Sequence, residues 1–321
     1  MTPTTMHAMV IEEVGGPDRL VARDVPRPQR VGSEVLVKVT AAGVNRCDVE
    51  AREGRADGAA LATFPAVLGH DFSGVVVETP YAAHPLRPGD AVYGMGTFPR
   101  GGGSYAEYIS VPSMSVARKP ASLSHVEAAG VPLAALTAWG MVVEVAKAHE
   151  GQRMLIQAGA GGVGHFAVQF ASYFGAHVVA TGSQRNSGWL RELGAAEVVD
   201  YSSAEFDRTT RDVDVVLNLL DDDEVATRSL AVLRPGGLMV QAPSSNREAL
   251  VGRAADAGLR ATGFAVTPDA ATLAVIGRLL DSGDVHVYVD DVYDLADAAD
   301  AQRRLEQGHT RGKLVLRVAD E

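Results

Sequence analysis

The chain has 321 residues, enough for two domains, and 46% of them are hydrophobic, enough for a substantial core. Its formal net charge of −11 argues against a nucleic-acid-binding surface, because such a surface needs clustered lysine and arginine. The single cysteine, Cys47, excludes a disulfide framework, and the lack of an apolar run of about 18 residues or of a signal-peptide pattern predicts a soluble, cytoplasmic protein.

The first 120 residues predict a compact, barrel-like β domain. Short apolar segments are separated by turn signals such as Arg87-Pro88-Gly89-Asp90. A helix is predicted from Val126 to Ala148, immediately before the next domain. The expected strands are Ala8–Glu12, Leu20–Asp24, Glu34–Gly43, Gly74–Glu78, Ala91–Met95 and Ser104–Val111.

A glycine-rich turn follows this helix. The apolar run Met154–Ala158 ends in Gly159-x-Gly161-x-x-Gly164, and apolar residues with helical spacing continue to Ala171. This is the strand, tight turn and helix start at which Rossmann folds bind the pyrophosphate of a dinucleotide. Glycines let the backbone approach the phosphates, and the helix start offers N–H groups and a positive dipole end. A glycine triplet alone is weak support, because glycines also form ordinary turns.

The segments after the turn strengthen the dinucleotide interpretation. Strands are predicted at Ala176–Thr181, Glu197–Asp200, Asp214–Asn218 and Leu233–Val240, with a short helix at Trp189–Leu193. Strands that alternate with helices over this length predict a doubly wound parallel sheet.

The end of the second strand indicates which dinucleotide binds. An NAD site usually has an acidic residue there to bind the ribose 2′-hydroxyl. This chain has Thr181-Gly182-Ser183-Gln184-Arg185, with no acid, and hydroxyl and guanidinium groups suit a 2′-phosphate. We therefore predict NADPH, bound at Gly182, Ser183 and Arg185. The alternative is that Arg185 is only a solvated surface charge.

The last part of the chain is predicted to return to the first domain. Leu259–Val266 is an apolar run, Ala270–Leu280 and Leu295–Gln307 have helical patterns, and Lys313–Val318 is a final strand suited to the β domain's sheet. We therefore expect a β domain at 1–125, completed by 286–321, and a nucleotide-binding domain at 126–285.

Six blocks carry a family resemblance, together with the glycine turn. They are Ala42-Gly43-Val44-Asn45-x-x-Asp48, Leu68-Gly69-His70-Asp71-Phe72-Ser73-Gly74-Val75-Val76, Leu86-x-Pro88-Gly89-Asp90-x-Val92, Gly103-Ser104-Tyr105-Ala106-Glu107-Tyr108, Leu136-Thr137-Ala138-Trp139 and Thr310-Arg311-Gly312-Lys313-Leu314-Val315-Leu316. With them the chain resembles the medium-chain dehydrogenase/reductase superfamily, specifically its zinc-independent quinone oxidoreductase (zeta-crystallin-like) branch. The resemblance runs from about Ala8 to Val318. It implies a Rossmann domain inserted into a GroES-like β-barrel domain.

The same resemblance argues against a catalytic zinc. At the three ligand positions of zinc-dependent relatives this chain has Asn45, His70 and Leu133. An amide and an aliphatic side chain are poor zinc ligands, so His70 is expected to have a packing or hydrogen-bonding role. Cys47 lies two residues past the ligand position and has no obvious base partner in the sequence. It is therefore predicted to be an inert, buried thiol.

The resemblance also implies roles for individual residues. Asn45 would lie beside the nicotinamide, Asp48 would line the substrate cleft or fix its loop, and Thr137 would hydrogen-bond the nicotinamide end. The pyrophosphate would lie against Gly159, Ala160, Gly161, Gly162, Val163 and Gly164. The remaining expected cofactor contacts are Tyr201 near the adenine ribose, Asn218, Gln241, Ala242 and Phe264 at the cofactor's edge, and Lys313 near the phosphates.

The resulting prediction is an NADPH-dependent enzyme that transfers hydride to a quinone or an α,β-unsaturated carbonyl. The alternatives are an enoyl-thioester reductase of the same superfamily and a non-catalytic crystallin or RNA-binding relative. We expect no nucleic-acid or membrane partner. A homodimer is expected through the strand at Leu259–Val266, because an apolar sheet edge tends to pair.

Overall fold

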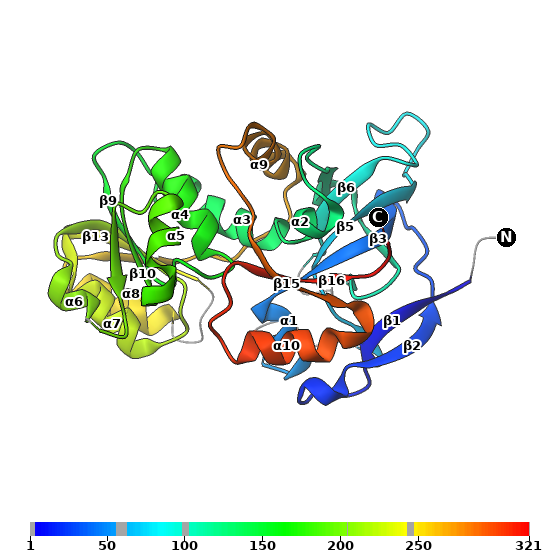
Figure 1. Ribbon diagram of the computed structural model, residues 1–321, viewed down its shortest axis with the longest axis horizontal. Coiled ribbons are helices and arrows are strands. Elements are labelled where there is room, and N and C mark those ends of the chain that lie inside the picture. Colours follow the sequence, from blue (N-terminus) through cyan, green and yellow to red (C-terminus); the bar gives the residue numbers. More distant parts are fainter. Residues whose placement is uncertain (1–3, 56–62, 98–102, 204, 243–246, 321) are drawn as a thin grey trace. The chain divides into compact units, whose positions relative to one another are not determined.

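The structure is a computed structural model that describes residues 4–55, 63–97, 103–203, 205–242 and 247–320 (Figure 1). The chain divides into two compact units. Unit 1 comprises Met1–Leu136 and Thr267–Glu321, and unit 2 comprises Thr137–Val266. The second unit is therefore inserted into the first, with its boundaries at Thr137 and Val266 in place of 126 and 285.

Unit 1 is built on a seven-stranded sheet with the order β15-β16-β3-β5-β6-β8, and β7 pairs with β3 outside that path. The C-terminal strand β16 runs antiparallel to β3, which confirms that the last strand completes the first domain's sheet. A second sheet has the order β2-β1-β4. The strands are β1 (Thr5–Ile11), β2 (Val21–Pro26), β3 (Glu34–Val44), β4 (Ala66–Val67), β5 (Asp71–Glu78), β6 (Ala91–Met95), β7 (Tyr108–Pro112), β8 (Val116–Arg118), β15 (Val289–Asp294) and β16 (Lys313–Arg317).

The core of unit 1 follows from the alternation of its strands. Val35, Val37 and Val39 point to one face of β3 and are buried together with Phe72 of β5 and Val92 of β6. Polar Lys38, between two of these valines, is exposed on the opposite face. The β pattern of the first 120 residues therefore predicts the observed architecture correctly.

The helices of unit 1 include α1 (Arg46–Arg52), α2 (His125–Ala129), α9 (Ala270–Ser282) and α10 (Ala298–Glu306), with 3-10 turns η1 (Pro17–Arg19), η2 (Ser113–Ser115) and η5 (Leu295–Asp297). Helix α9 belongs to this unit because it contacts β8 and η2. The single helix expected over 126–148 is wrong. The segment is divided into α2, α3 (Pro132–Trp139) and a π-helical turn η3 (Gly140–Val145), because Gly130 ends α2 and Pro132 starts α3.

Unit 2 is a six-stranded parallel sheet with the order β11-β10-β9-β12-β13-β14. The first strand of the unit, β9, is central. The next two strands, β10 and β11, are added on one side of it, and the strands from β12 onward are added on the other side. This is the doubly wound order, and it confirms the predicted fold class. The strands are β9 (Arg153–Ile156), β10 (His177–Gly182), β11 (Glu197–Asp200), β12 (Val213–Asn218), β13 (Leu233–Gln241) and β14 (Arg260–Gly263).

The core of unit 2 is formed by strands that are apolar on both faces, as is usual in parallel sheets. Leu155, Val179, Val216 and Met239 come from four neighbouring strands and are all fully buried. The helices are α4 (Gly164–Tyr173), η4 (Gln184–Asn186), α5 (Ser187–Glu192), α6 (Phe206–Thr209), α7 (Asp223–Leu230) and α8 (Arg247–Asp256). Within the described ranges, none of the protein's helices is both long and apolar enough to cross a membrane.

Candidate functional site

The glycine turn of unit 2 lies between β9 and α4 and is held by the end of β10. Ala158 has a left-handed backbone (φ 51°), which turns the chain sharply after the strand. The N–H of Ala158 donates to Thr181 Oγ1 (3.0 Å), and the N–H of Gly159 donates to the Thr181 carbonyl oxygen (2.9 Å). Thr181 in turn donates to Gln157 Oε1 (2.8 Å). The turn is therefore fixed by side chains that are buried within unit 2.

The three glycines of the motif differ in what a side chain at each position would contact. A Cβ on Gly164 would lie 2.2 Å from the Ala158 carbonyl oxygen, and one on Gly159 would lie 3.0 Å from Ala180 Cβ. These two positions are required by packing of the turn against its own fold. A Cβ on Gly161 would meet only the Ala158 oxygen, at 3.4 Å. The protein thus leaves free the space at Gly161 that a phosphate would need, beside the start of α4.

The end of β10 contains a feature that the sequence reasoning did not weigh. Ser183 precedes η4 and Arg185 is exposed, as the predicted 2′-phosphate site requires. However, Gly182 pairs with Asp200 of β11, and the Asp200 carboxylate accepts the N–H of Gln184. Hydrogen bonds from Ser202, the strongest influence, hold the pKa of Asp200 below its usual value. An acid therefore lies at this turn after all, supplied by the third strand.

Other expected cofactor residues lie at the carboxyl ends of the strands. Asn218 and Gln241 end β12 and β13, are buried, and hydrogen-bond each other (2.8 Å). Ala242 donates its N–H to the Asn218 carbonyl oxygen. The half-buried Phe264 ring rests on Gly140, where a Cβ would lie 2.0 Å from the ring. Of the six residues expected at the pyrophosphate, three are buried (Gly159, Ala160 and Gly164) and three are half-buried (Gly161, Gly162 and Val163).

Two further residues complete the list for unit 2. Thr137 is buried on α3, and Tyr201, directly after β11, is 54% exposed. A hollow of about 620 Å³ lies elsewhere, at the amino-terminal ends of the strands, where Gln152, Asp214 and Arg260 line it. Ligands of doubly wound sheets bind at the carboxyl ends, so this hollow is not the expected nucleotide site.

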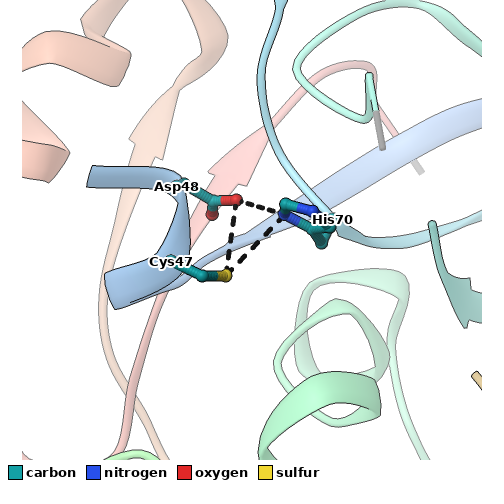
Figure 2. Close-up of side chains that lie close together, drawn as sticks. All are labelled: Cys47, Asp48 and His70. Carbon is teal, nitrogen blue, oxygen red and sulfur yellow. Dashed lines mark hydrogen bonds and ion pairs between the residues drawn. The ribbon is translucent and has the colours of Figure 1, made fainter. Parts of the chain in front are cut away.

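In unit 1, the start of α1 carries a buried polar cluster. Asp48 is fully buried and accepts the Asn45 N–H (2.9 Å) and the Tyr105 hydroxyl (3.0 Å). Its other oxygen lies 2.7 Å from His70 Nδ1, so the imidazole donates to it (Figure 2). Burial, together with the nearby Asp48, raises the pKa of Tyr105 well above its usual value. Asp48 therefore holds the backbone of Asn45 in place, and its expected role at the substrate cleft stays a prediction.

Cys47 has an imidazole beside it that the sequence analysis did not identify. Its Sγ lies 3.7 Å from His70 Nδ1 and 3.9 Å from Asp48 Oδ1 (Figure 2), but Nδ1 already donates to Asp48 and therefore does not act as a base toward the thiol. The sequence could not show this, because His70 is 23 residues away. The thiol is half-buried. Burial above all, and the nearby Asp48, raise the pKa of Cys47 well above its usual value, so the thiol stays protonated at neutral pH.

Lys313 is buried in unit 1, and its expected place near the phosphates stays a prediction. Its side chain is 4% exposed, and its ammonium donates to Asn45 Oδ1 and to the Val44 carbonyl oxygen (3.1 Å). Asp71 Oδ2 lies 3.6 Å from the same ammonium. The charge of Lys313 is therefore satisfied inside unit 1, next to Asn45.

Asp71 completes this group. Its Oδ2 accepts the Asn45 carboxamide (2.9 Å) and its Oδ1 accepts the Leu133 N–H (2.8 Å). Burial raises the pKa of Asp71, and the Lys313 ammonium counteracts that shift. Gly43 lies opposite Asp71 in the sheet, and a Cβ there would lie 2.4 Å from the Ala129 carbonyl oxygen. The absence of a side chain at Gly43 therefore lets α2 approach this carboxylate.

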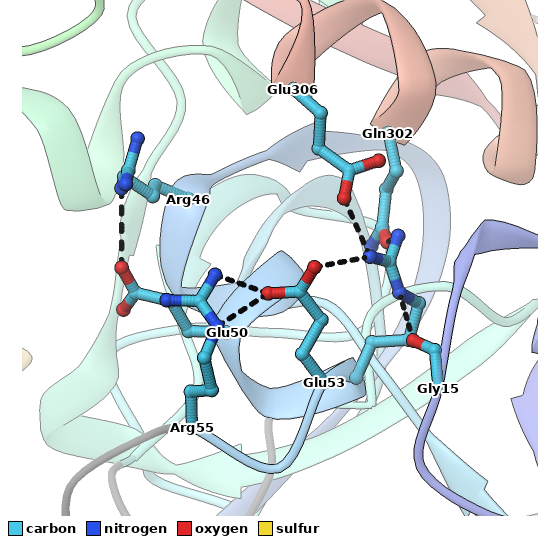
Figure 3. A network of polar contacts seen from close by, with 8 residues as sticks. Gly15, Arg46, Glu50, Glu53, Arg55, Gln302 and Glu306 are labelled. Carbon is cyan, nitrogen blue, oxygen red and sulfur yellow. Dashed lines mark hydrogen bonds and ion pairs between the residues drawn. The ribbon is translucent and has the colours of Figure 1, made fainter.

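The other end of α1 is held by Arg52, which is fully buried. Figure 3 labels its partners Gly15, Gln302 and Glu306. The Arg52 guanidinium donates to the Gly15 carbonyl oxygen (2.9 Å), to Gln302 Oε1 (2.8 Å) and to Glu306 (2.7 Å). The last two residues belong to α10. The helix that follows Asn45 and carries Cys47 is thus fixed at both ends.

These residues fit a catalytic metal poorly. At the family's ligand positions, Asn45 is hydrogen-bonded at both ends of its carboxamide and Leu133 offers only an N–H, which Asp71 accepts. Cys47, Asp48 and His70 have ligand atoms within 4.8 Å of one another. However, Asp48 and His70 are hydrogen-bonded to each other at 2.7 Å, and the raised pKa of Cys47 keeps its thiol protonated, whereas a metal needs free lone pairs and a thiolate.

The sequence reasoning missed four residues that shape these sites: Gln157 and Thr181 behind the glycine turn, Asp71 beside Asn45, and Tyr105 on Asp48. Thr181 could have been found as the end of the neighbouring parallel strand. Asp71 and Tyr105 were visible only as members of the resembling blocks.

Comparisons with known proteins agree with this geometry. Residues 32–121 match the family "Alcohol dehydrogenase GroES-like domain" and residues 193–316 match "Zinc-binding dehydrogenase". The chain is 31% identical to the mitochondrial NAD(P)H oxidoreductase RTN4IP1 of Danio rerio, covering 99% of this chain and 92% of that protein. It is 32% identical to a chloroplastic NADPH-dependent alkenal/one oxidoreductase of Arabidopsis thaliana, covering 98% of this chain and 80% of that protein.

A solved structure is similar over its whole length. The quinone oxidoreductase from Coxiella burnetii has a TM-score of 0.93 and 33% identity, covering 98% of this chain and 99% of that one. Fold, motifs and relatives agree over nearly the full chain. The chain therefore belongs to the medium-chain dehydrogenase/reductase superfamily, in its quinone oxidoreductase-like branch.

Proposed function

We propose that this protein is an NADPH-dependent oxidoreductase that reduces a quinone or an α,β-unsaturated carbonyl without a catalytic zinc. The observation that carries the proposal is the glycine turn, in which Gly159 and Gly164 are required by packing while the space at Gly161 stays open. The relatives named for NAD(P)H, alkenal/one and quinone substrates support the reaction class.

The proposed site has no electrophilic metal, and the proposed substrates need none. NADPH, when bound, supplies a hydride to a carbon that is already electrophilic. Negative charge then develops on the substrate's carbonyl oxygen. The protein must orient the substrate, exclude water and donate hydrogen bonds to that oxygen. The buried groups around Asn45 are suited to this task, since Asn45 is held by Lys313 and Asp71.

The proposed preference for NADPH over NADH depends on two opposing groups. Ser183 and the exposed Arg185 would bind a 2′-phosphate. Asp200 lies at the same turn and opposes a second negative charge there. Because Arg185 is exposed and the Asp200 carboxylate already accepts hydrogen bonds from Ser202, we propose a modest preference for NADPH.

Turnover experiments test the proposal. Purified protein is mixed with NADPH or NADH, and the coenzyme absorbance is followed after addition of 1,4-benzoquinone, an enone, or a simple alcohol or aldehyde. We expect oxidation of NADPH by the quinone or the enone, unaffected by a chelator. Turnover only of the alcohol or aldehyde, abolished by the chelator, would contradict both the substrate class and the zinc-free mechanism.

We further propose a cytoplasmic homodimer that binds neither nucleic acid nor membranes. Strand β14 (Arg260–Gly263) ends the six-stranded sheet and pairs only with β13 among the strands that the structure describes. An open sheet edge favours pairing with a second copy. Light scattering after gel filtration tests this: a species of 33.6 kDa would contradict the dimer.

A further inference from the structure

We propose that the Asn45 carboxamide donates a hydrogen bond from Nδ2 to the carbonyl oxygen of the substrate, and that Lys313 and Asp71 are positioning residues that allow only this orientation. The inference deepens the proposed function and rests on it for the identity of the substrate. It assigns one donor atom to Asn45, and it gives a role to Lys313 and Asp71, neither of which is expected to contact the substrate.

The Asn45 carboxamide has one allowed orientation. An amide group can normally be turned over at little cost, because its oxygen and nitrogen have similar shapes. Here Oδ1 receives the Lys313 ammonium, and Nδ2 donates to Asp71 Oδ2 at 2.9 Å. An ammonium can only donate, and a carboxylate can only accept. Turning the amide over would place N–H against ammonium and oxygen against carboxylate, so only the observed orientation is allowed.

The Asn45 carboxamide nitrogen has two N–H groups, and one of them donates to Asp71. Among the residues that the structure describes, the second has no hydrogen-bond partner, although Asn45 is only 5% exposed. A buried donor without a partner is costly, so this N–H is suited to an acceptor that arrives with a ligand.

The proposed substrates offer such an acceptor. The oxygen of an enone or quinone gains negative charge as the hydride arrives, so a donor placed there acts mainly in the transition state. The Lys313 ammonium, in contact with Oδ1, withdraws electron density from the amide and makes its N–H a better donor. Asp71 and Lys313 together are neutral and buried, so they orient the amide without adding a net charge.

Two variants test the proposal. Asn45→Asp keeps the size of the side chain and removes the donor. The charge-balanced pair Lys313→Met with Asp71→Asn keeps Asn45 and releases its orientation. Lys38→Met is the matched control, because Lys38 is an exposed lysine on a strand of the same sheet. Melting temperature and NADPH binding are measured first, to establish that each variant folds and loads its coenzyme.

The kinetic readout is the separation of kcat from KM. For Asn45→Asp we expect kcat for the quinone or enone to fall about 100-fold, as for loss of a transition-state donor, with KM for NADPH changed less than about threefold. For the charge-balanced pair we expect a fall of about tenfold, since a loosely held donor loses part of its effect. Lys38→Met should match the wild type. An unchanged kcat in Asn45→Asp would overturn the proposal.

A spectroscopic readout works without turnover. 4-Nitrophenol resembles the oxyanion of a reduced quinone, and a donor to its oxygen favours the coloured phenolate. In the presence of NADP⁺ we expect the wild type to increase the phenolate fraction, Asn45→Asp to abolish the increase, and Lys38→Met to retain it. If the wild type reduces neither quinone nor enone but shows this shift, the proposed function fails and the donor assignment stands. If Asn45→Asp and the charge-balanced pair both retain the shift, the donor assignment fails whatever the substrate.

Discussion

The different demands on the three glycines of the nucleotide turn can be measured separately. In Gly164→Ala, the new Cβ would lie 2.2 Å from the Ala158 carbonyl oxygen, about 1.2 Å short of ordinary contact, and 2.8 Å from Gly159 Cα. Both neighbours are backbone atoms, so the turn and α4 must move apart. Overpacking of this kind costs about 2 kcal/mol, which corresponds to a fall in melting temperature of about 4–8 °C.

The same substitution is expected to weaken binding of NADPH. Backbone displacement of about 1 Å misplaces the N–H groups at the start of α4, and one charge-assisted hydrogen bond contributes about 1.5–3 kcal/mol. We therefore expect the Kd for NADPH to rise about 10-fold to 100-fold. Gly161→Ala should separate the two effects. Its Cβ has an ordinary contact at 3.4 Å, so the melting temperature should stay within about 1 °C while NADPH binding weakens at least about tenfold.

The control is Gly252→Ala, in the exposed middle of α8, where a Cβ meets nothing within 4 Å. An alanine there should raise stability by about 0.5–1 kcal/mol and leave NADPH binding unchanged. Thermal melts by circular dichroism and titrations of coenzyme fluorescence give both quantities. The reasoning is refuted if Gly164→Ala melts like the wild type, or if Gly161→Ala binds NADPH as tightly as Gly252→Ala does.

Three further outcomes follow from the geometry. Arg52→Met should lower the free energy of unfolding, measured by urea titration, by about 2–4 kcal/mol, because it leaves the Gln302 and Glu306 acceptors on α10 without their buried donor. A loss below about 0.5 kcal/mol would contradict the role of the buried network. Asp200→Asn should raise the ratio of kcat/KM for NADPH to that for NADH about twofold to fivefold, and Arg185→Ala should lower it. If both variants keep the ratio of the wild type, the 2′-phosphate does not bind at this turn. The pKa values of Cys47 and Tyr105 are raised in the folded protein, so the unfolded chain releases these protons at lower pH than the folded protein does. Their contribution to stability is therefore present below about pH 9 and is lost as the pH rises. Melting curves from pH 8 to 11 should show a smaller decline of the melting temperature in the double variant Cys47→Ser, Tyr105→Phe than in the wild type.

The parallel sheet of unit 2 was predictable from the sequence because its signals are local. Each strand is a short apolar run, and the glycine turn states where a strand ends and a helix begins. The expected helix over 126–148 failed for a local reason too. An apolar pattern with helical spacing continues across Gly130 and Pro132, and the pattern does not show that these two residues interrupt it.

The polar site of unit 1 was only partly predictable, because its contacts join distant parts of the chain. The sequence marks Asn45 and Asp48 through the resemblance, yet Lys313, which contacts Asn45, lies 268 residues from it, and the sequence analysis did not place the two side by side. A lysine after a turn near the chain's end suggests an exposed cation. The register of β16 on β3, in which Leu314 pairs with Val44, instead brings Lys313 beside Asn45.

The burial of Lys313 and Asp71 is itself an argument for a positioning role. Removing an ammonium and a carboxylate from water is expensive, and a buried ion pair often contributes less to stability than apolar side chains of the same size. The pair lies where one carboxamide needs a fixed orientation, and the 3.6 Å between Nζ and Oδ2 exceeds a good hydrogen bond, so both charges contact Asn45 more closely than each other. In an ion pair that served stability alone, the ammonium and the carboxylate would make their shortest contact with each other. We therefore expect the charge-balanced variant to match or exceed the melting temperature of the wild type while it turns over more slowly, whereas a purely structural pair would lose stability and activity together.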